Sequence, residues 1–200
     1  MTHMTEIELK AHVYNKESLL NTLKTFATFE QKIYKSDVYY KNDKISVRIR
    51  NQISQKNDKK EEKSFFTYKK KEVIKSADTD FSTEVNDEKE TELSDPSALE
   101  IFLTDAGFVP FAKKQKDVSA FSLNTQYGKA HIEVCNVEPL DDFIEIEILS
   151  KESDSATIQN VQQELKNILK KCNISEDCIE NRYYNDMIKS RLPNSLEHKD

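Results

Sequence analysis

Charged and apolar residues alternate along five short segments of the chain. The first segment is residues 5–11 (TEIELKA), and charged positions two apart return at residues 47–50, 68–71, 132–135 and 144–148. In a β-strand, a period of two places the charged side chains on one face and the apolar side chains on the other. The pattern therefore predicts strands that are polar on one face and apolar on the other.

Turn residues and apolar spacing predict the remaining elements. Further strands are expected at residues 33–41, 45–51, 64–74, 81–86 and 143–149, and a hairpin at 108–123 and 127–135. Apolar residues three and four apart predict amphipathic helices that begin after Asn15, near residues 94–96, at Ser153 or Ser155, and after residues 175–177. The charged residues 54–63 are expected to form an exposed, mobile loop.

This order of elements predicts an α+β fold. About eight strands in mostly antiparallel hairpins, each with one apolar face, can close into a barrel. We therefore expect a closed eight-stranded antiparallel β-barrel with amphipathic helices packed outside it, so that the charged faces point inward. Residues 1–190 are expected to form a single domain, and residues 191–200 a disordered C-terminal tail.

Composition narrows the classes of function. The net charge of −6 disfavours nucleic-acid binding, and only two glycines argue against a glycine-rich phosphate loop. The sequence has no run of 18 apolar residues and no signal-peptide pattern, which predicts a cytoplasmic protein without a membrane partner. The three cysteines lack the spacing of metal ligands and are expected to be free thiols.

The charged faces form a candidate binding site. The candidate cations are Lys10, Arg48, Arg50, Lys69, Lys114 and Lys116, with Lys71 as a further candidate. The candidate acids are Glu6, Glu8, Glu84, Glu133, Glu145 and Glu147. Burying such charges costs several kcal/mol for each ion, unless they neutralise one another or bind a highly charged ligand. A triphosphate bridged to the carboxylates by Mg²⁺ or Mn²⁺ would meet that demand. The alternative is that these faces point outward and are solvated.

A series of motifs, in order along the chain, resembles the CYTH superfamily, which includes class IV adenylyl cyclases and thiamine triphosphatases. The similarity covers residues 4–189 and is carried by Glu6-x-Glu8-x-Lys10, Asp37-Val38-Tyr39-Tyr40, Val47-Arg48-Ile49-Arg50, Phe66-Thr67-Tyr68-Lys69, Gly107-Phe108, Lys114-Gln115-Lys116, residues 137–147 and residues 183–188.

The resemblance implies a tunnel that binds ATP or another triphosphate. By this similarity the phosphate-binding residues are Lys10, Arg48, Arg50, Lys69, Lys114 and Lys116, which together with Glu6 and Glu8 form the predicted catalytic set. The metal ligands would be Glu6, Glu8, Glu145 and Glu147. Residues 37–40 and 137–147 look more like those of the class IV cyclases than those of the thiamine triphosphatases. Because the class IV cyclases form dimers, the resemblance implies a homodimer.

Three positions depart from the family pattern, and one of them is Asp141, where the family usually has a small residue. Lys116 stands where the family has an arginine, so a bidentate phosphate contact is lost there. Cys135 stands where the cyclases carry an aspartate, and Glu133, two residues earlier on the same face, is the candidate to replace it as a metal ligand.

Three functions follow from one cavity. A cyclase would let the ribose 3′-hydroxyl of ATP attack the α-phosphorus, which yields cyclic AMP and pyrophosphate. An inorganic or thiamine triphosphatase would let water attack the γ-phosphorus instead. The third function is a nucleotide- or polyphosphate-binding protein without catalytic activity.

Overall fold

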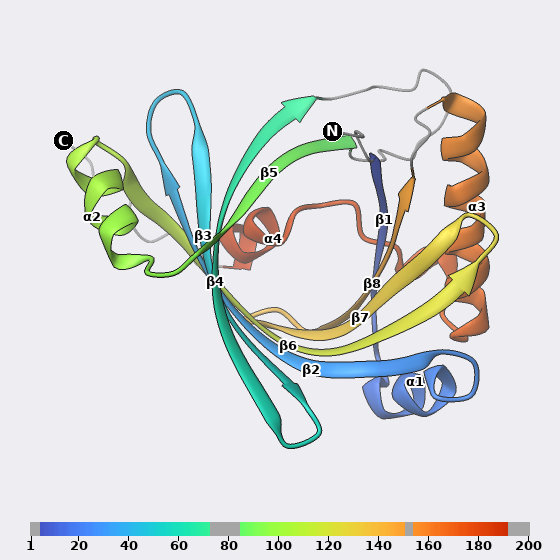
Figure 1. Ribbon diagram of the computed structural model, residues 1–200. Helices are drawn as coiled ribbons and strands as arrows, with labels where there is room; N and C mark the ends of the chain where they lie inside the picture. The colour runs from blue at the N-terminus through green and yellow to red at the C-terminus, as the bar shows by residue number, and fades with distance from the viewer. Residues whose placement is uncertain (1–4, 73–84, 151–153, 192–200) are drawn as a thin grey trace.

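The computed structural model in Figure 1 describes residues 5–72, 85–150 and 154–191, and at residues 5, 69–72 and 85–88 it describes the backbone alone. Over these residues the elements follow one another as β1 (Thr5–His12), α1 (Lys16–Leu23), β2 (Thr28–Lys41), β3 (Ser46–Lys56), β4 (Lys59–Glu72), β5 (Val85–Leu93), α2 (Ser97–Asp105), β6 (Val109–Thr125), β7 (Gly128–Glu138), β8 (Asp142–Ser150), α3 (Ser155–Lys171), the 3-10 helix η1 (Glu176–Cys178) and α4 (Tyr184–Arg191).

The strands form one strongly curved antiparallel sheet. Their order is β1-β8-β7-β6-β2-β3-β4-β5, and every pairing is antiparallel. The sequence-based prediction of an eight-stranded antiparallel α+β fold is therefore confirmed. The predicted closure of the barrel is not confirmed. The edge strands β1 and β5 approach each other, but the described residues show no hydrogen-bonded ladder between them.

Three helices cover the convex face of the sheet. Ile7, Leu9 and Ala11 of β1 point outward and pack with buried side chains of α1 and α3. Leu103 of α2 packs against Tyr40 of β2 and apolar residues of β3. The alternation in the sequence thus assigned the faces correctly, because the helices bury the apolar face and leave the charged face on the concave side.

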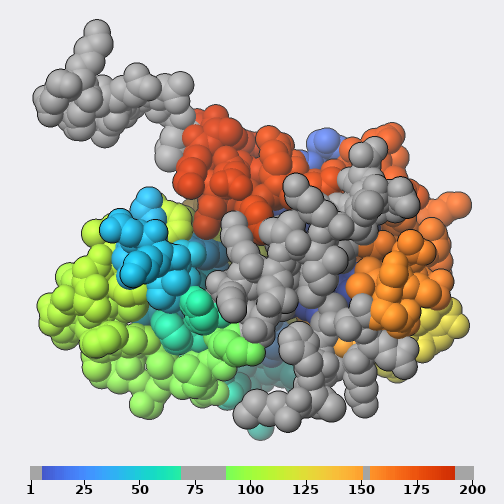
Figure 2. Space-filling model, turned by 90° about the horizontal axis from the view of Figure 1, so that it is seen from above, coloured from blue at the N-terminus to red at the C-terminus, as the bar shows by residue number. Residues whose placement is uncertain are grey.

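The fourth helix corrects the prediction that all helices lie outside. Tyr184 and Met187 of α4 pack with Ile33, Val118 and Phe143, which belong to the concave face. Figure 1 shows α4 inside the curve of the sheet, and Figure 2 shows it (red) between the β2–β3 turn (blue) and α3 (orange). The apolar side of α4 therefore covers one end of the concave face.

The charged segment 54–63 is a hairpin, so the predicted loop is wrong. Strands β3 and β4 pair as far as Lys56 and Lys59, on either side of a two-residue turn. This hairpin projects beyond the body of the protein (Figure 1). Both of its faces meet water, and ion pairs such as Lys60–Glu62 at 2.8 Å lie on its surface. A strand solvated on both faces lacks the apolar period that identifies strands in a sequence.

The turn of this hairpin requires a left-handed backbone conformation at Asn57, whose φ is 53°. Asparagine tolerates that conformation, whereas alanine pays a penalty of roughly 1 kcal/mol. We expect Asn57→Ala to lower the free energy of unfolding by about this amount, and Asn57→Gly to change it by less. Urea denaturation of the two variants measures the difference, and equal losses would contradict the explanation.

Helix α3 begins at Ser155, one of its two predicted starts, and Asp154 caps it by accepting a hydrogen bond from the Thr157 amide. The last helix differs from the prediction. Ser175 begins only a 3-10 turn, and Ile179 then pairs with Ala11 as an isolated β-bridge, so the last helix starts five residues later than Ile179, at Tyr184. Residues 73–84, which include part of the predicted strand 81–86, and residues 192–200 of the predicted tail lie outside the described residues; Arg191 ends α4.

Candidate functional site

The concave face encloses a cavity of about 980 Å³. Its lining brings together ten of the predicted site residues: Glu6, Glu8, Lys10, Arg48, Arg50, Lys114, Lys116, Glu133, Glu145 and Glu147. The side chains of Lys69 and Lys71, and all of Glu84, lie outside the described part of the structure. The alternative that these charged faces are scattered over the outer surface is therefore wrong for the ten described residues.

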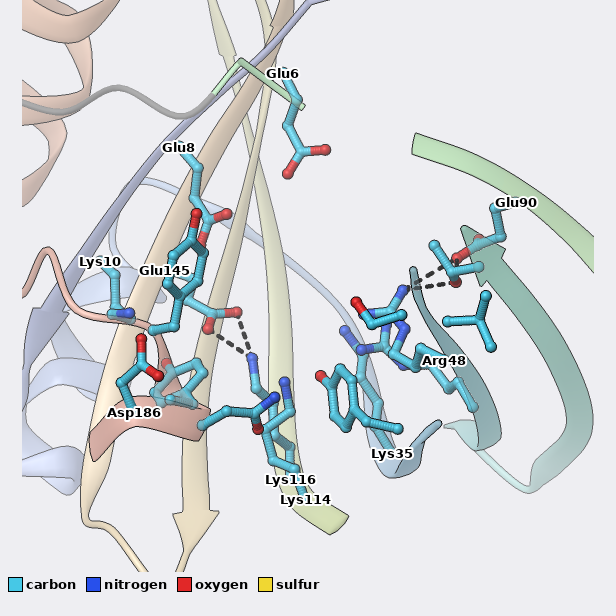
Figure 3. A pocket seen from close by; sticks show the side chains of 18 of the residues that line it. Glu6, Glu8, Lys10, Lys35, Arg48, Glu90, Lys114, Lys116, Glu145 and Asp186 are labelled. Atoms are coloured by element: carbon cyan, nitrogen blue, oxygen red, sulfur yellow. Dashed lines mark hydrogen bonds and ion pairs between the residues drawn. The ribbon is translucent and has the colours of Figure 1, made fainter. Parts of the chain in front are cut away.

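The charges are separated into two walls. Strands β1, β8 and β7 carry the acids, and the register places Glu8 opposite Glu147 and Glu133 opposite Glu145. Strands β6, β2 and β3 carry most of the cations. Figure 3 shows Glu6, Glu8 and Glu145 on one side of the cavity, with Lys35 and Arg48 on the other. The cavity can therefore hold an anion and a cation side by side.

Lys116 and Glu145 connect the two walls. Lys116 Nζ lies 2.6 Å and 2.8 Å from the two carboxylate oxygens of Glu145 (Figure 3). Burial raises the pKa of Glu145, but Lys116, a hydrogen bond with Tyr184 and the charge of Lys35 together hold the pKa below its ordinary value. Burial likewise lowers the pKa of Lys116, but Glu145 and the other acidic groups around it together hold that pKa above its ordinary value. Both groups are therefore charged at neutral pH.

Asp37 neutralises the centre of the cationic wall. Its side chain is only 1% exposed, and Arg50 binds it through Nε at 2.7 Å and Nη2 at 2.9 Å. Lys114 Nζ lies 3.4 Å from the same carboxylate. Burial lowers the pKa of Lys114 to about 8, and the positive charge of Lys116 acts in the same direction. The sequence analysis quoted Asp37 only as part of a motif and missed this pairing.

Lys35 is a cavity residue that the sequence analysis missed. Its Nζ lies 2.6 Å from one carboxylate oxygen of Glu133 and 2.8 Å from the other. The signal was present, because Lys35 precedes Asp37 by two residues in β2 and therefore shares its face. Burial lowers the pKa of Lys35, so an anionic ligand would favour its charged form.

Arg48 is held at the far side of the cavity by Thr67, which was named in the sequence only as part of a motif, and by Glu90, which was not predicted. Its Nη2 donates to Thr67 Oγ1 at 2.9 Å and to Glu90 Oε2 at 3.3 Å, as Figure 3 shows. Its Nε is buried and has no acceptor among the described residues. A guanidinium with one donor still unpaired is a ready contact for a phosphate oxygen.

Without a bound cation, the acidic wall raises the pKa values of two of its carboxyl groups and so favours their protonated forms. Burial, followed by the negative charge of Glu145, raises the pKa of Glu8 to about 7. Burial, followed by the charges of Glu6 and Glu8, raises the pKa of Glu147 to about 8. Carboxylate oxygens are the ligands that Mg²⁺ and Mn²⁺ prefer, so the donor set fits such an ion. The described His, Cys, Asp and Glu side chains do not form a preassembled group of three around one metal position.

Cys135 does not provide a metal ligand. It is fully buried in an apolar cluster with Phe143, and burial raises the pKa of its thiol to about 12. A neutral thiol is a poor ligand for hard cations. Glu133, which lines the cavity, is the remaining candidate at this place. The prediction that all three cysteines are free thiols is confirmed.

The protein is therefore a curved antiparallel sheet whose concave face forms one cavity. An acidic wall and a basic wall face each other across that cavity. The CYTH domain family model matches residues 4–184. The chain therefore belongs to the CYTH domain family, which confirms the resemblance found in the sequence.

Solved structures share this fold. A conserved hypothetical protein from Pyrococcus furiosus is 25% identical, with a TM-score of 0.68 over 90% of this chain and 98% of its own. A proposed adenylate cyclase from Vibrio parahaemolyticus is 18% identical, with a TM-score of 0.68 over 92% and 98%. A proposed adenylyl cyclase from Hippeastrum with a dominant triphosphatase activity is 14% identical, with a TM-score of 0.60 over 98% and 100%.

A search of curated proteins finds no match to the chain. Within the described residues, no helix has both the length and the apolar character needed to cross a membrane.

Proposed function

We propose that this protein is a metal-dependent triphosphate-processing enzyme of the class IV adenylyl cyclase type, which converts ATP to cyclic AMP and pyrophosphate. The observation that carries the proposal is the single cavity in which a wall of lysines and arginines faces a wall of glutamates. Phosphate oxygens suit the first wall, and a divalent cation suits the second. Lys69 remains a predicted member of the cationic wall.

The cationic wall would bind and orient the phosphates. Arg48 offers its unpaired Nε, and Arg50 and Lys114 lie together on Asp37. We expect Lys116 to exchange Glu145 for a phosphate oxygen, because the incoming ligand carries more negative charge than one carboxylate. That exchange would leave Glu145 available to a metal ion, together with Glu6, Glu8, Glu133 and Glu147.

A bound Mg²⁺ or Mn²⁺ would lower the pKa of the attacking hydroxyl group and neutralise phosphate charge. The protein side chains would then hold the 3′-hydroxyl in line with the α-phosphorus and stabilise the charge that develops on the leaving pyrophosphate. The cavity lies at the upper end of the ~300–1,000 Å³ range for small-molecule sites. It therefore has room for a nucleoside beyond the three phosphates, which favours ATP over inorganic triphosphate.

The second candidate is an inorganic or thiamine triphosphatase, which hydrolyses the γ-phosphate of inorganic triphosphate or of thiamine triphosphate. The observation that favours it is the likeness in fold to the Hippeastrum protein with its dominant triphosphatase activity. The same walls would serve either reaction, since the difference lies in which phosphorus meets the nucleophile.

Product analysis separates the candidates. The purified protein is incubated with ATP, thiamine triphosphate or inorganic triphosphate, each with Mg²⁺ or Mn²⁺. We expect cyclic AMP and pyrophosphate from ATP, whereas orthophosphate from any of the three would identify a triphosphatase. Unchanged ligand with a raised melting temperature would identify a binding protein without catalysis.

Two variants control this assay. Lys114→Met should reduce product formation by a factor on the order of 100 or more, because a cation at the phosphates is lost. Lys170→Met, on the exposed side of α3, should leave it unchanged. The proposal would be contradicted if the unmodified protein formed no product and if its melting temperature did not change with any of the ligands. The homodimer and the cytoplasmic location remain predictions.

A further inference from the structure

Tyr184, the first residue of α4, lies among three lysines of the cavity. Its ring centroid is 4.4 Å from Lys10 Nζ, 4.6 Å from Lys116 Nζ and 5.3 Å from Lys114 Nζ. A cation within about 6 Å of a tyrosine ring is attracted to its face, more strongly when water is excluded. The Tyr184 side chain is buried. One ring thus contacts three cations from two separate strands, β1 and β6.

The backbone places this ring independently of the lysines. Ile179 forms a β-bridge with Ala11, and the Glu180 amide donates to the Lys10 carbonyl at 2.8 Å, so the segment before α4 is fixed on β1. At the other end of the helix, Arg191 donates to the Pro139 carbonyl at 3.1 Å. The position of α4 inside the sheet is therefore determined by contacts outside the lysine cluster.

The three lysines need such a support. Like charges that share one site repel each other, and each flexible lysine side chain can reach several acceptors. Lys10 lies directly opposite Glu145 in the register of β1 and β8, yet its ammonium group donates to the Arg182 carbonyl and lies over the Tyr184 ring. The segment that leads into α4 therefore holds Lys10 at the aromatic ring.

We propose that Tyr184 is a positioning residue, whose ring holds the ammonium groups of Lys10, Lys114 and Lys116 in the arrangement that receives the triphosphate. The inference rests on the proposed function, because it concerns binding at the same site. Tyr184 also packs edge-on against Phe143, with ring centroids 5.0 Å apart. A role limited to packing is the alternative that the experiment must separate.

Calorimetric titration with inorganic triphosphate, without divalent metal, measures the contribution of the ring. Tyr184→Leu removes the aromatic face, and we expect the dissociation constant to rise by a factor of about ten or more. Tyr184→Phe keeps the ring and should stay within about threefold of the unmodified protein. Phe143→Leu is the matched control: it disturbs the same apolar cluster without touching the lysines, and should not weaken binding.

Thermal unfolding of each variant confirms that it is folded, and Tyr184→Met replaces Tyr184→Leu if the latter does not fold. Three results would overturn this inference and leave the proposed function standing. They are normal binding by Tyr184→Leu, equally weakened binding by Phe143→Leu, and binding by Tyr184→Phe that is as weak as that of Tyr184→Leu. An unmodified protein that binds neither inorganic triphosphate nor ATP, with or without divalent metal, would overturn both.

Discussion

Arg50→Met should lose at least 100-fold in turnover of the triphosphate, and about 3 kcal/mol of stability as well. The two losses have different causes. Turnover falls because a cation of the wall that would bind the phosphates disappears. Stability falls because Asp37, which is 1% exposed, then has Lys114 at 3.4 Å as its one ion-pair partner among the described residues. Removing one partner of a buried ion pair costs about 3–5 kcal/mol, and Lys114 reduces that cost.

A double variant distinguishes the two effects. Arg50→Met combined with Asp37→Asn removes both charges of the pair, so we expect most of the stability to return while turnover stays low. Urea unfolding and the product assay measure these quantities. Lys60→Met, which breaks an exposed ion pair with Glu62, is the surface control and should cost at most about 1 kcal/mol. An Arg50→Met protein with full stability or full turnover would contradict the assigned role of Arg50.

The metal-free protein should lose stability as the pH rises from about 5 to about 8. In the folded state the pKa of Glu8 is about 7 and that of Glu147 about 8, against an ordinary value of 4.5 for each. Within this window the folded state therefore binds more protons than the unfolded state, and the free energy of unfolding falls with pH. One pKa unit corresponds to about 1.4 kcal/mol, so we expect a total loss of several kcal/mol for this interacting pair.

The same link between pKa and stability predicts how the free energy of unfolding changes at acidic pH. The pKa values of Asp37 and Glu145 lie below their ordinary values, so these groups contribute stability above the unfolded-state pKa and lose it as the pH falls. Together the two effects place the maximum of stability near pH 5 when metal is absent. Mg²⁺ or Mn²⁺ should flatten the decline between pH 5 and 8, because a cation favours the charged carboxylates.

Thermal unfolding across this pH range tests the prediction. Glu147→Gln should reduce the slope between pH 5 and 8, whereas Glu17→Gln on the exposed side of α1 should leave it unchanged. Stability that rises between pH 5 and 8 in the metal-free protein would contradict the environment assigned to Glu8 and Glu147.

The faces of the strands were predictable from the sequence alone. A period of two requires Glu6, Glu8 and Lys10 to share one face of β1, and the apolar residues between them to share the other. The helical spacing in residues 155–171 predicted α3, whose buried Val161, Leu165 and Ile168 cover that apolar face. These features depend only on neighbours in the chain, and local spacing is sufficient to reveal them.

Where the periodic spacing of apolar residues was weak, the structure predicted from the sequence was wrong. The tip of the β3–β4 hairpin, residues 55–62, is polar and exposed because it extends into solvent. The short helix α4 carries apolar residues that could pack on either face of the sheet. In the structure the other three helices cover the convex face, and α4 packs on the concave face. Lys35 was overlooked because a single lysine in a strand with mixed polar residues is usually solvated.

The sequence by itself determined that acidic and basic faces exist, and that several strands carry them. Only the tertiary structure decided which charges neutralise one another, since Lys116 is separated from Glu145 by 29 positions and Lys35 from Glu133 by 98. It also decided that Tyr184 enters the lysine cluster, because α4 folds back inside the sheet. Pairing over such separations depends on the curvature and register of the sheet, and those arise from the packing of the entire chain.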